Sequence, residues 1–241
     1  MRHLINESNS PKISIIGKNS AALAHALSIQ SIELEVADGA IFIVSATDGI
    51  VSADIASWRL SRELYIPSIV VITELASSDI DFEDMTTIAS KMLDPVVTPY
   101  LVLHGDDGSP AALIELQSLL IHDYTSGTNV TQPADPEHIE LVQEFREEYL
   151  EQLEDAGEDS FEAGLLFPAL PWVEGTPIGI AEITGYLNRI PVSAKSLRVV
   201  CKRTGSTFVC PIIGMKFASP DQRGTTCWWM CSAIPAPEMA P

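Results

Sequence analysis

Residues 40–45, Ala-Ile-Phe-Ile-Val-Ser, form a continuous apolar run of the kind found in strands that are covered on both faces of a parallel sheet. Residues 68–72, Ser-Ile-Val-Val-Ile, form a second run of this kind. Between the two, residues 52–65 carry apolar side chains at helical spacing. A buried strand, an amphipathic helix and another buried strand predict a doubly wound α/β sheet.

Further elements extend this unit on both sides. Additional strands are expected at 13–16 and 165–170, and helices at 21–27, 81–93, 137–154 and 178–187. An antiparallel hairpin, with strands at 100–104 and 111–121 around an Asp-Asp-Gly turn, is expected as an insertion at about 99–125. After Pro191, strands at 197–201 and 207–213 indicate a second, β-rich module. We therefore predict domains at 1–190 and 191–241.

Composition narrows the functional class. The chain has 33 acidic and 14 basic residues and a formal net charge of −19, which argues against general DNA binding. No apolar run is long enough to span a membrane, and residues 1–12 lack a secretory apolar segment, so we expect a cytoplasmic protein. The four cysteines have C-x8-C and C-x3-C spacings (Cys201, Cys210, Cys227, Cys231), which do not match a zinc ribbon, and we predict no metal site.

Several stretches resemble one family in content and order. Residues 37–49, ADGAIFIVSATDG, resemble a strand and turn of the nucleotide-binding domain of elongation factor G and of the elongation factor G-like proteins. Trp58, Pro67, residues 121–128 (IHDYTSGT) and residues 135–138 (DPEH) continue the resemblance. It implies a P-loop-NTPase-like fold and the ribosome or another GTPase as partner. Intact members of the family use GTP and Mg²⁺, whereas for this chain we expect no cofactor, for the reasons that follow.

The phosphate-binding motif of such proteins is altered here. A phosphate loop needs G-x4-G-K-[S/T], because small residues let successive backbone N–H groups surround the phosphates. The equivalent turn is Gly17-Lys18-Asn19-Ser20, which lacks the second glycine and is about three residues too short. We interpret it as a plain strand-to-helix turn.

The guanine-recognition motif is altered as well. The family pattern [Asn/Thr]-Lys-x-Asp corresponds to Thr73-Glu74-Leu75-Ala76, so a negative charge replaces the lysine and alanine replaces the carboxylate that binds the base. Ser193-Ala194-Lys195 resembles another guanine contact, but its place in the family pattern is taken by residues 171–174. Gly17, Lys18, Asn19, Ser20, Thr73, Glu74 and Ala76 are therefore predicted to be vestigial positions of a nucleotide site.

The catalytic segment has no counterpart. Between Leu27 and Ala37 there is no room for the switch loop, the two strands and the D-x-x-G-H segment that organise Mg²⁺ and water in the family. We predict a sheet that lacks some strands and has an exposed edge, which would favour pairing with another chain. Residues 202–209 resemble the opening of the β-barrel that follows this domain in the family, so a barrel fragment is expected.

Three functional hypotheses remain open on the sequence alone. The first is a degenerate, truncated relative that neither binds nor hydrolyses GTP and acts as a non-catalytic interaction module. The second is a GTPase that acts in elongation on the ribosome, with other groups replacing the lost ones. The third is a decayed gene product without a selected function.

Overall fold

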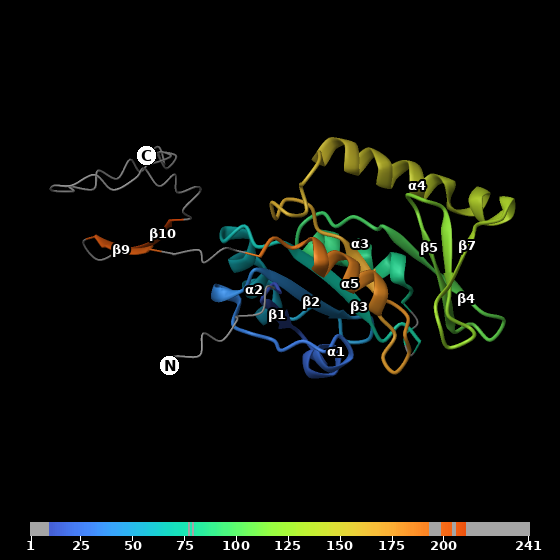
Figure 1. The fold of residues 1–241 in the computed structure, drawn as a ribbon, viewed down its shortest axis with the longest axis horizontal. Helices are drawn as coiled ribbons and strands as arrows, with labels where there is room; N and C mark the ends of the chain where they lie inside the picture. The colour runs from blue at the N-terminus through green and yellow to red at the C-terminus, as the bar shows by residue number, and fades with distance from the viewer. Residues whose placement is uncertain (1–9, 77, 79, 193–198, 204–205, 211–241) are drawn as a thin grey trace, which may run out of the picture. The chain divides into compact units, whose positions relative to one another are not determined.

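The computed structural model describes residues 10–76, 78, 80–192, 199–203 and 206–210 (Figure 1). The chain divides into two units, Met1–Ala194 and Lys195–Pro241. The first unit contains a parallel sheet, an antiparallel sheet, five α-helices and one short 3-10 helix within its described residues. The second contains one described pair of strands.

The parallel sheet forms the centre of the first unit. Its four strands follow the order β1 (Ile13–Ile16), β2 (Gly39–Ser45), β3 (Ser68–Thr73) and β8 (Ala169–Pro171). All three pairings are parallel, with Ile41 opposite Ile15 and Ile69. Every residue of β2 and β3 is buried, as their uninterrupted apolar runs predict. The predicted α/β class with a parallel sheet is confirmed.

Helices cover both faces of this sheet, and the sheet separates two hydrophobic cores. On one face, Leu23 of α1 (Ser20–Ala26) and Ile183 of α5 (Ile180–Arg189) share a core with Ile41. On the other face, the core around Phe42 includes side chains of α2 (Ser52–Glu63) and α3 (Phe82–Met92). The period of two along β2 thus divides its side chains between the two layers.

The first connection of the sheet has an unusual geometry. The chain passes from β1 to β2 and from β2 to β3 in the same direction across the sheet, yet α1 and α2 lie on opposite faces. Leu34, at the end of the first connection, packs in the core on the α2 side. This connection therefore passes around the outer edge of β1, from the face that α1 covers to the face that α2 covers.

The outer edge of β1 is covered by the chain itself. The Ile15 backbone N–H donates to Oγ of Ser31 at 2.9 Å, and the Ile32 N–H donates to the Ile13 carbonyl at 3.0 Å. The segment that follows α1 thus returns along the edge strand, and only a short 3-10 turn, Leu34–Val36, precedes β2. The expected open edge was wrong at these positions, because a hydroxyl and a backbone N–H replace the partner strand.

The insertion is larger than the predicted hairpin. It is a four-stranded antiparallel sheet in the order β4 (Tyr100–His104), β5 (Pro110–Glu115), β6 (Leu120–Asp123) and β7 (Val130–Pro133). The predicted strand 111–121 is split, because Leu119 turns the chain at a φ of 58° and its N–H bonds the Glu115 carbonyl. β7 is exposed at every residue and so had no apolar pattern to reveal it.

A long acidic helix follows this sheet. α4 (Pro136–Ala156) begins after Asp135, whose carboxylate accepts the His138 backbone N–H at 2.9 Å. Pro136 occupies the first turn, where a missing N–H costs nothing. Val142 and Tyr149 are its buried residues and join the core on the α1 and α5 side of the parallel sheet.

The second unit is described at ten residues. β9 (Val199–Arg203) and β10 (Ser206–Cys210) pair in an antiparallel hairpin. The strands predicted at 197–201 and 207–213 overlap β9 and β10, but their ends differ from the observed ends by one to three residues. Cys227, Cys231 and the Ser193-Ala194-Lys195 stretch lie outside the described residues.

Candidate functional site

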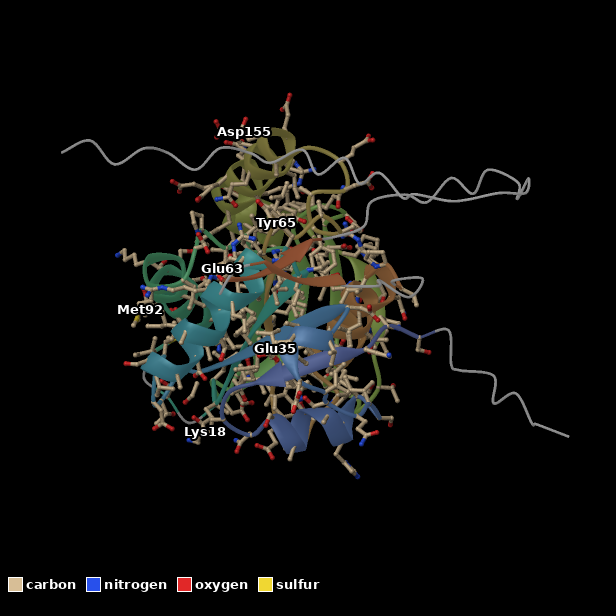
Figure 2. The ribbon with its side chains drawn as sticks, turned by 90° about the vertical axis from the view of Figure 1, so that its left-hand side faces the viewer. Lys18, Glu35, Glu63, Tyr65, Met92 and Asp155 are labelled. Carbon is tan, nitrogen blue, oxygen red and sulfur yellow. The ribbon has the colours of Figure 1, made fainter. Side chains whose placement is uncertain are left out.

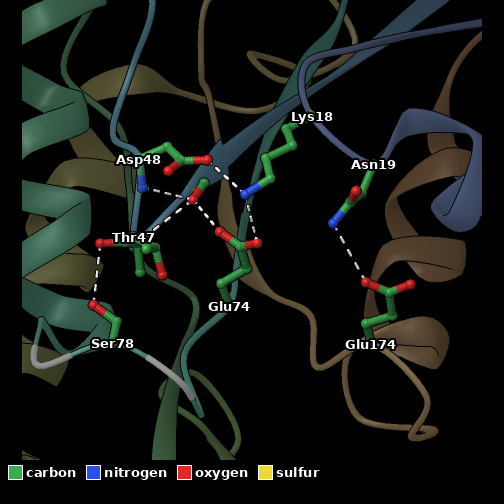
Figure 3. Close-up of polar contacts among 9 residues, drawn as sticks. Lys18, Asn19, Thr47, Asp48, Glu74, Ser78 and Glu174 are labelled. Carbon is green, nitrogen blue, oxygen red and sulfur yellow. Dashed lines mark hydrogen bonds and ion pairs between the residues drawn. The ribbon is translucent and has the colours of Figure 1, made fainter.

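The candidate site lies at the carboxyl ends of the parallel strands. In open α/β sheets, the loops that leave this edge commonly carry binding residues. Here they are residues 17–19 after β1, residues 46–49 after β2, the residues that follow Thr73, and residues 172–175 after β8. Figure 3 shows the polar contacts among these loops.

The first loop is a three-residue turn between Ile16 and Ser20. Gly17 has a φ of 114°, and a Cβ atom there would approach the Ile43 carbonyl oxygen to 2.5 Å, so only glycine fits. Asn19 has a φ of 60°, a left-handed conformation that this residue type tolerates, and α1 begins directly after it. The turn therefore lies close against β2.

The second loop is organised by Ser45, the last residue of β2. Its buried hydroxyl oxygen accepts the backbone N–H groups of Thr47, at 3.2 Å, and of Asp48, at 2.8 Å. The same hydroxyl donates to the Glu74 carboxylate. One side chain thus fixes the loop after β2 and the carboxylate that follows β3.

Lys18 connects three of the loops. Its ammonium donates to Oδ2 of Asp48 at 2.5 Å and to Oε1 of Glu74 at 2.8 Å (Figure 3). Hydrogen bonds to these two carboxylates raise the pKa of Lys18 to about 12, and the bond from Lys18 lowers the pKa of Glu74. Because the Lys18 side chain is 47% exposed, water screens the pair, and its main effect is to orient the groups.

The same edge carries a third carboxylate. Nδ2 of Asn19 donates to Oε2 of Glu174, in the loop after β8, at 3.4 Å. This edge of the sheet thus carries three carboxylates, those of Asp48, Glu74 and Glu174, and one ammonium, that of Lys18. We refer to Lys18, Asn19, Ser45, Asp48, Glu74 and Glu174 as the carboxyl-edge cluster. With one positive and three negative charges, the cluster has a formal charge of −2.

Sequence reasoning anticipated only part of this cluster. Lys18, Asn19 and Glu74 are brought together, whereas Ala76 is exposed and offers no polar group. Thr73 is buried at the end of β3, and among the described residues its hydroxyl has no hydrogen-bond partner. Gly17 and Ser20 contribute backbone geometry to the first turn.

Three members of the cluster, Ser45, Asp48 and Glu174, were missed as functional residues. Their signal is positional, because each lies at or just after the end of a predicted strand, and parallel strands bring those ends to one edge. Within the described residues there is no group of three or more His, Cys, Asp or Glu side chains placed to hold a metal ion. No described helix is both long and apolar enough to cross a membrane.

Comparisons with known proteins show that this chain is distantly similar to elongation factor G-like proteins. No family model matches the chain. Elongation factor G-like proteins of two Mycobacterium tuberculosis strains, CDC 1551 / Oshkosh and ATCC 25618 / H37Rv, are each 26% identical over 174 residues, covering 62% of this chain. The match covers 24% of those proteins, so this chain spans about a quarter of the length of these relatives.

A solved structure shares part of this fold. A crystal structure of a protein from Thermus thermophilus superposes with a TM-score of 0.55 and 25% identity, covering 66% of this chain and 27% of the other. The combination of a parallel sheet with a separate antiparallel sheet is consistent with elongation factor G-like domains. These similarities relate the chain, at a distance, to the elongation factor G-like proteins and so to the translational GTPases.

Proposed function

We propose that this chain carries a translational-GTPase-like domain that does not bind GTP and acts as a non-catalytic interaction module. The observation that carries the proposal is the position of Lys18, whose ammonium is held between Asp48 and Glu74. The family resemblance suggests the ribosome, or a GTPase that works on it, as the partner, in the cytoplasm.

The geometry of the first turn supports the loss of phosphate binding. A phosphate loop surrounds its ligand with consecutive backbone N–H groups and adds the positive end of a helix. Here the turn has three residues, and the helix that follows has only seven. Gly17 lies against Ile43, which leaves no room for the turn to expand on that side without moving β2.

The charge of the carboxyl-edge cluster also opposes a nucleotide. A phosphate that approached Lys18 would have to displace Asp48 and Glu74 and would then lie beside both carboxylates. Ala76 offers no acceptor to a guanine base, and the interval from Leu27 to Ala37 holds a 3-10 turn in place of a metal-binding switch. The residues present therefore do not fit GTP with Mg²⁺, which supports a non-catalytic role.

A titration tests the nucleotide part of the proposal. The full chain is titrated with a fluorescent GDP analogue at millimolar Mg²⁺, beside an intact elongation factor G as positive control. We expect no saturable signal. Binding tighter than about 10 μM would overturn the proposal, because that affinity represents about 7 kcal/mol of specific contacts. In that case a Lys18→Met variant shows whether the β1 turn carries the binding.

Two further measurements address the interaction module. Thermal unfolding of the chain should be cooperative, since a non-cooperative transition would instead favour a decayed product without a stable fold. Co-sedimentation with purified ribosomes, with and without an intact elongation factor, should show saturable association. A chain that melts cooperatively but never co-sediments in either condition would exclude the ribosome as partner.

A further inference from the structure

A cavity of about 540 Å³ lies between the antiparallel sheet, α4 and α5. Its walls include Tyr100, Glu115, His122, Tyr149, Glu182 and Tyr186. The size lies within the usual range for small-molecule sites. None of its lining residues belongs to the carboxyl-edge cluster. Figure 2 shows Lys18 and Asp155 at opposite ends of the view. Asp155 is two positions before Gly157, a residue that lines the cavity.

A buried carboxylate with an unused oxygen marks this cavity. The Glu182 side chain is 2% exposed, and its Oε1 accepts the Tyr124 hydroxyl at 2.6 Å. Among the described residues, no group donates to its Oε2. Buried polar atoms in proteins nearly always have a partner, and a buried charge without one is costly. The free oxygen therefore points to a donor that the described chain does not supply.

A histidine and two tyrosines line the cavity beside this carboxylate. His122 Nδ1 lies 3.6 Å from Oε1 of Glu182, while His122 Nε2 has no partner among the described residues. The His122 and Tyr100 rings pack edge to face, with centroids 5.9 Å apart. Burial raises the pKa of Tyr100 and of Tyr186, so both hydroxyls stay neutral and both rings keep an electron-rich face.

The charge of the walls favours a cation. Four lining carboxylates (Glu115, Glu158, Asp159, Glu182) compare with one lining guanidinium, that of Arg189. Nε of Arg189 already donates to Oε1 of Glu162 at 2.7 Å, and Glu162 is not one of the residues that line the cavity. Its guanidinium lies 5.2 Å from the Tyr186 ring centroid, so one wall of the cavity already packs against a planar cation.

We propose that this cavity binds a small organic cation that carries a guanidinium group, with Glu182 as its principal acceptor and the tyrosine rings as its walls. A guanidinium fits better than an ammonium because it is planar, stacks on aromatic rings and directs several N–H donors along fixed directions. It can therefore donate to the Glu182 carboxylate and to a second wall oxygen together. This site is independent of the proposed function, since it concerns a different set of residues.

The test compares three probes of equal chain length by calorimetry or by NMR titration of the full chain. We expect 1-butylguanidinium to bind saturably, with a Kd of about 1 mM or tighter, and 1-butylurea, its neutral isostere, to bind at least about tenfold more weakly. Equal binding of 1-butylurea would overturn the role of charge. Equal or tighter binding of n-butylammonium would overturn the guanidinium assignment.

Variants locate the site. Glu182→Gln, which still accepts the Tyr124 hydroxyl, should weaken 1-butylguanidinium binding at least about tenfold. Glu154→Gln removes the same charge from an exposed position of α4 outside the lining and should leave the Kd within about twofold. If Glu182→Gln fails to melt cooperatively, the partly exposed Glu115→Gln replaces it, with at least about a threefold loss expected. Unchanged binding in a folded cavity variant, or no saturation by about 20 mM, would overturn the proposal.

Discussion

Replacing Ser45 with alanine removes the side chain that joins the loops after β2 and β3. The change deletes two hydrogen bonds accepted from the Thr47 and Asp48 backbone N–H groups and one donated to the Glu74 carboxylate. A neutral hydrogen bond contributes about 0.5–1.5 kcal/mol, and one to a charged group about 1.5–3 kcal/mol. Thr47 and Asp48 are exposed, so water replaces part of the loss, and we expect a destabilisation of about 2 kcal/mol.

The measurement is urea unfolding, followed by far-ultraviolet circular dichroism and by tryptophan fluorescence. Two of the four tryptophans, Trp172 and Trp58, lie in the two separate cores of the parallel sheet, so their fluorescence reports on both layers. For a unit of this size, the expected loss shifts the midpoint by about 1 M urea and lowers Tm by about 4–8 °C. The slope of the transition should not change, because the folded surface stays the same.

The matched control is Ser57→Ala in α2. The Ser57 hydroxyl is exposed and donates only to the Ala53 carbonyl of its own helix, at 3.1 Å, so its loss should change stability by less than about 0.5 kcal/mol. A double-mutant cycle of Ser45→Ala with Glu74→Ala should give a coupling of about 1 kcal/mol. If Ser45→Ala behaves like the control, or if the coupling is zero, the hydroxyl does not hold these loops.

Two more predictions concern the loop after β8 and the ion pairs of Lys18. Gly179→Ala should cost at least about 3 kcal/mol, because φ is 91° and the new Cβ would lie 2.0 Å from the Pro171 carbonyl oxygen. Gly175→Ala, at a φ of 79° with open space around it, should cost about 1 kcal/mol, and equal losses in urea unfolding would refute the steric argument. The bond from Lys18 holds the pKa of Glu74 below its usual 4.5, so its stabilisation is present above pH 4.5 and is lost as the pH falls through the lowered value. Glu74→Gln and Lys18→Met should therefore flatten the fall of the urea midpoint between about pH 5 and pH 3, whereas the exposed Glu63→Gln should leave its slope unchanged.

The local elements of this protein could be predicted from the sequence. Residues 40–45 and 68–72 lie in buried strands. Their uninterrupted apolar runs are typical of strands that are covered on both faces of a parallel sheet. The helical spacing of 81–93 likewise predicted α3, which begins after Asp81 caps the Asp84 N–H at 2.8 Å. Prediction failed at β7, where all side chains are exposed and no pattern distinguishes a strand from a loop.

The candidate site could be predicted only in part, for a related reason. The altered motifs at Gly17–Ser20 and Thr73–Ala76 identified the relevant loops from their sequence alone. They could not show that Lys18 bonds Glu74, because the two residues are 56 positions apart and meet only when β1 and β3 align on either side of β2. From the sequence, Glu74 was a charge of the wrong sign. In the fold it is the partner of the lysine that precedes α1.

The sequence by itself thus determined the buried strands and the helices of the first unit, because burial period and turn chemistry act over a few neighbouring residues. Tertiary structure alone decided how the edge of β1 is covered by Ser31 and which carboxylates enclose Lys18. It also decided that Glu182 lines a cavity and that one of its carboxylate oxygens has no hydrogen-bond partner among the described residues. These features depend on distances between groups far apart in the chain, and only the packing of the two sheets and their helices sets those distances.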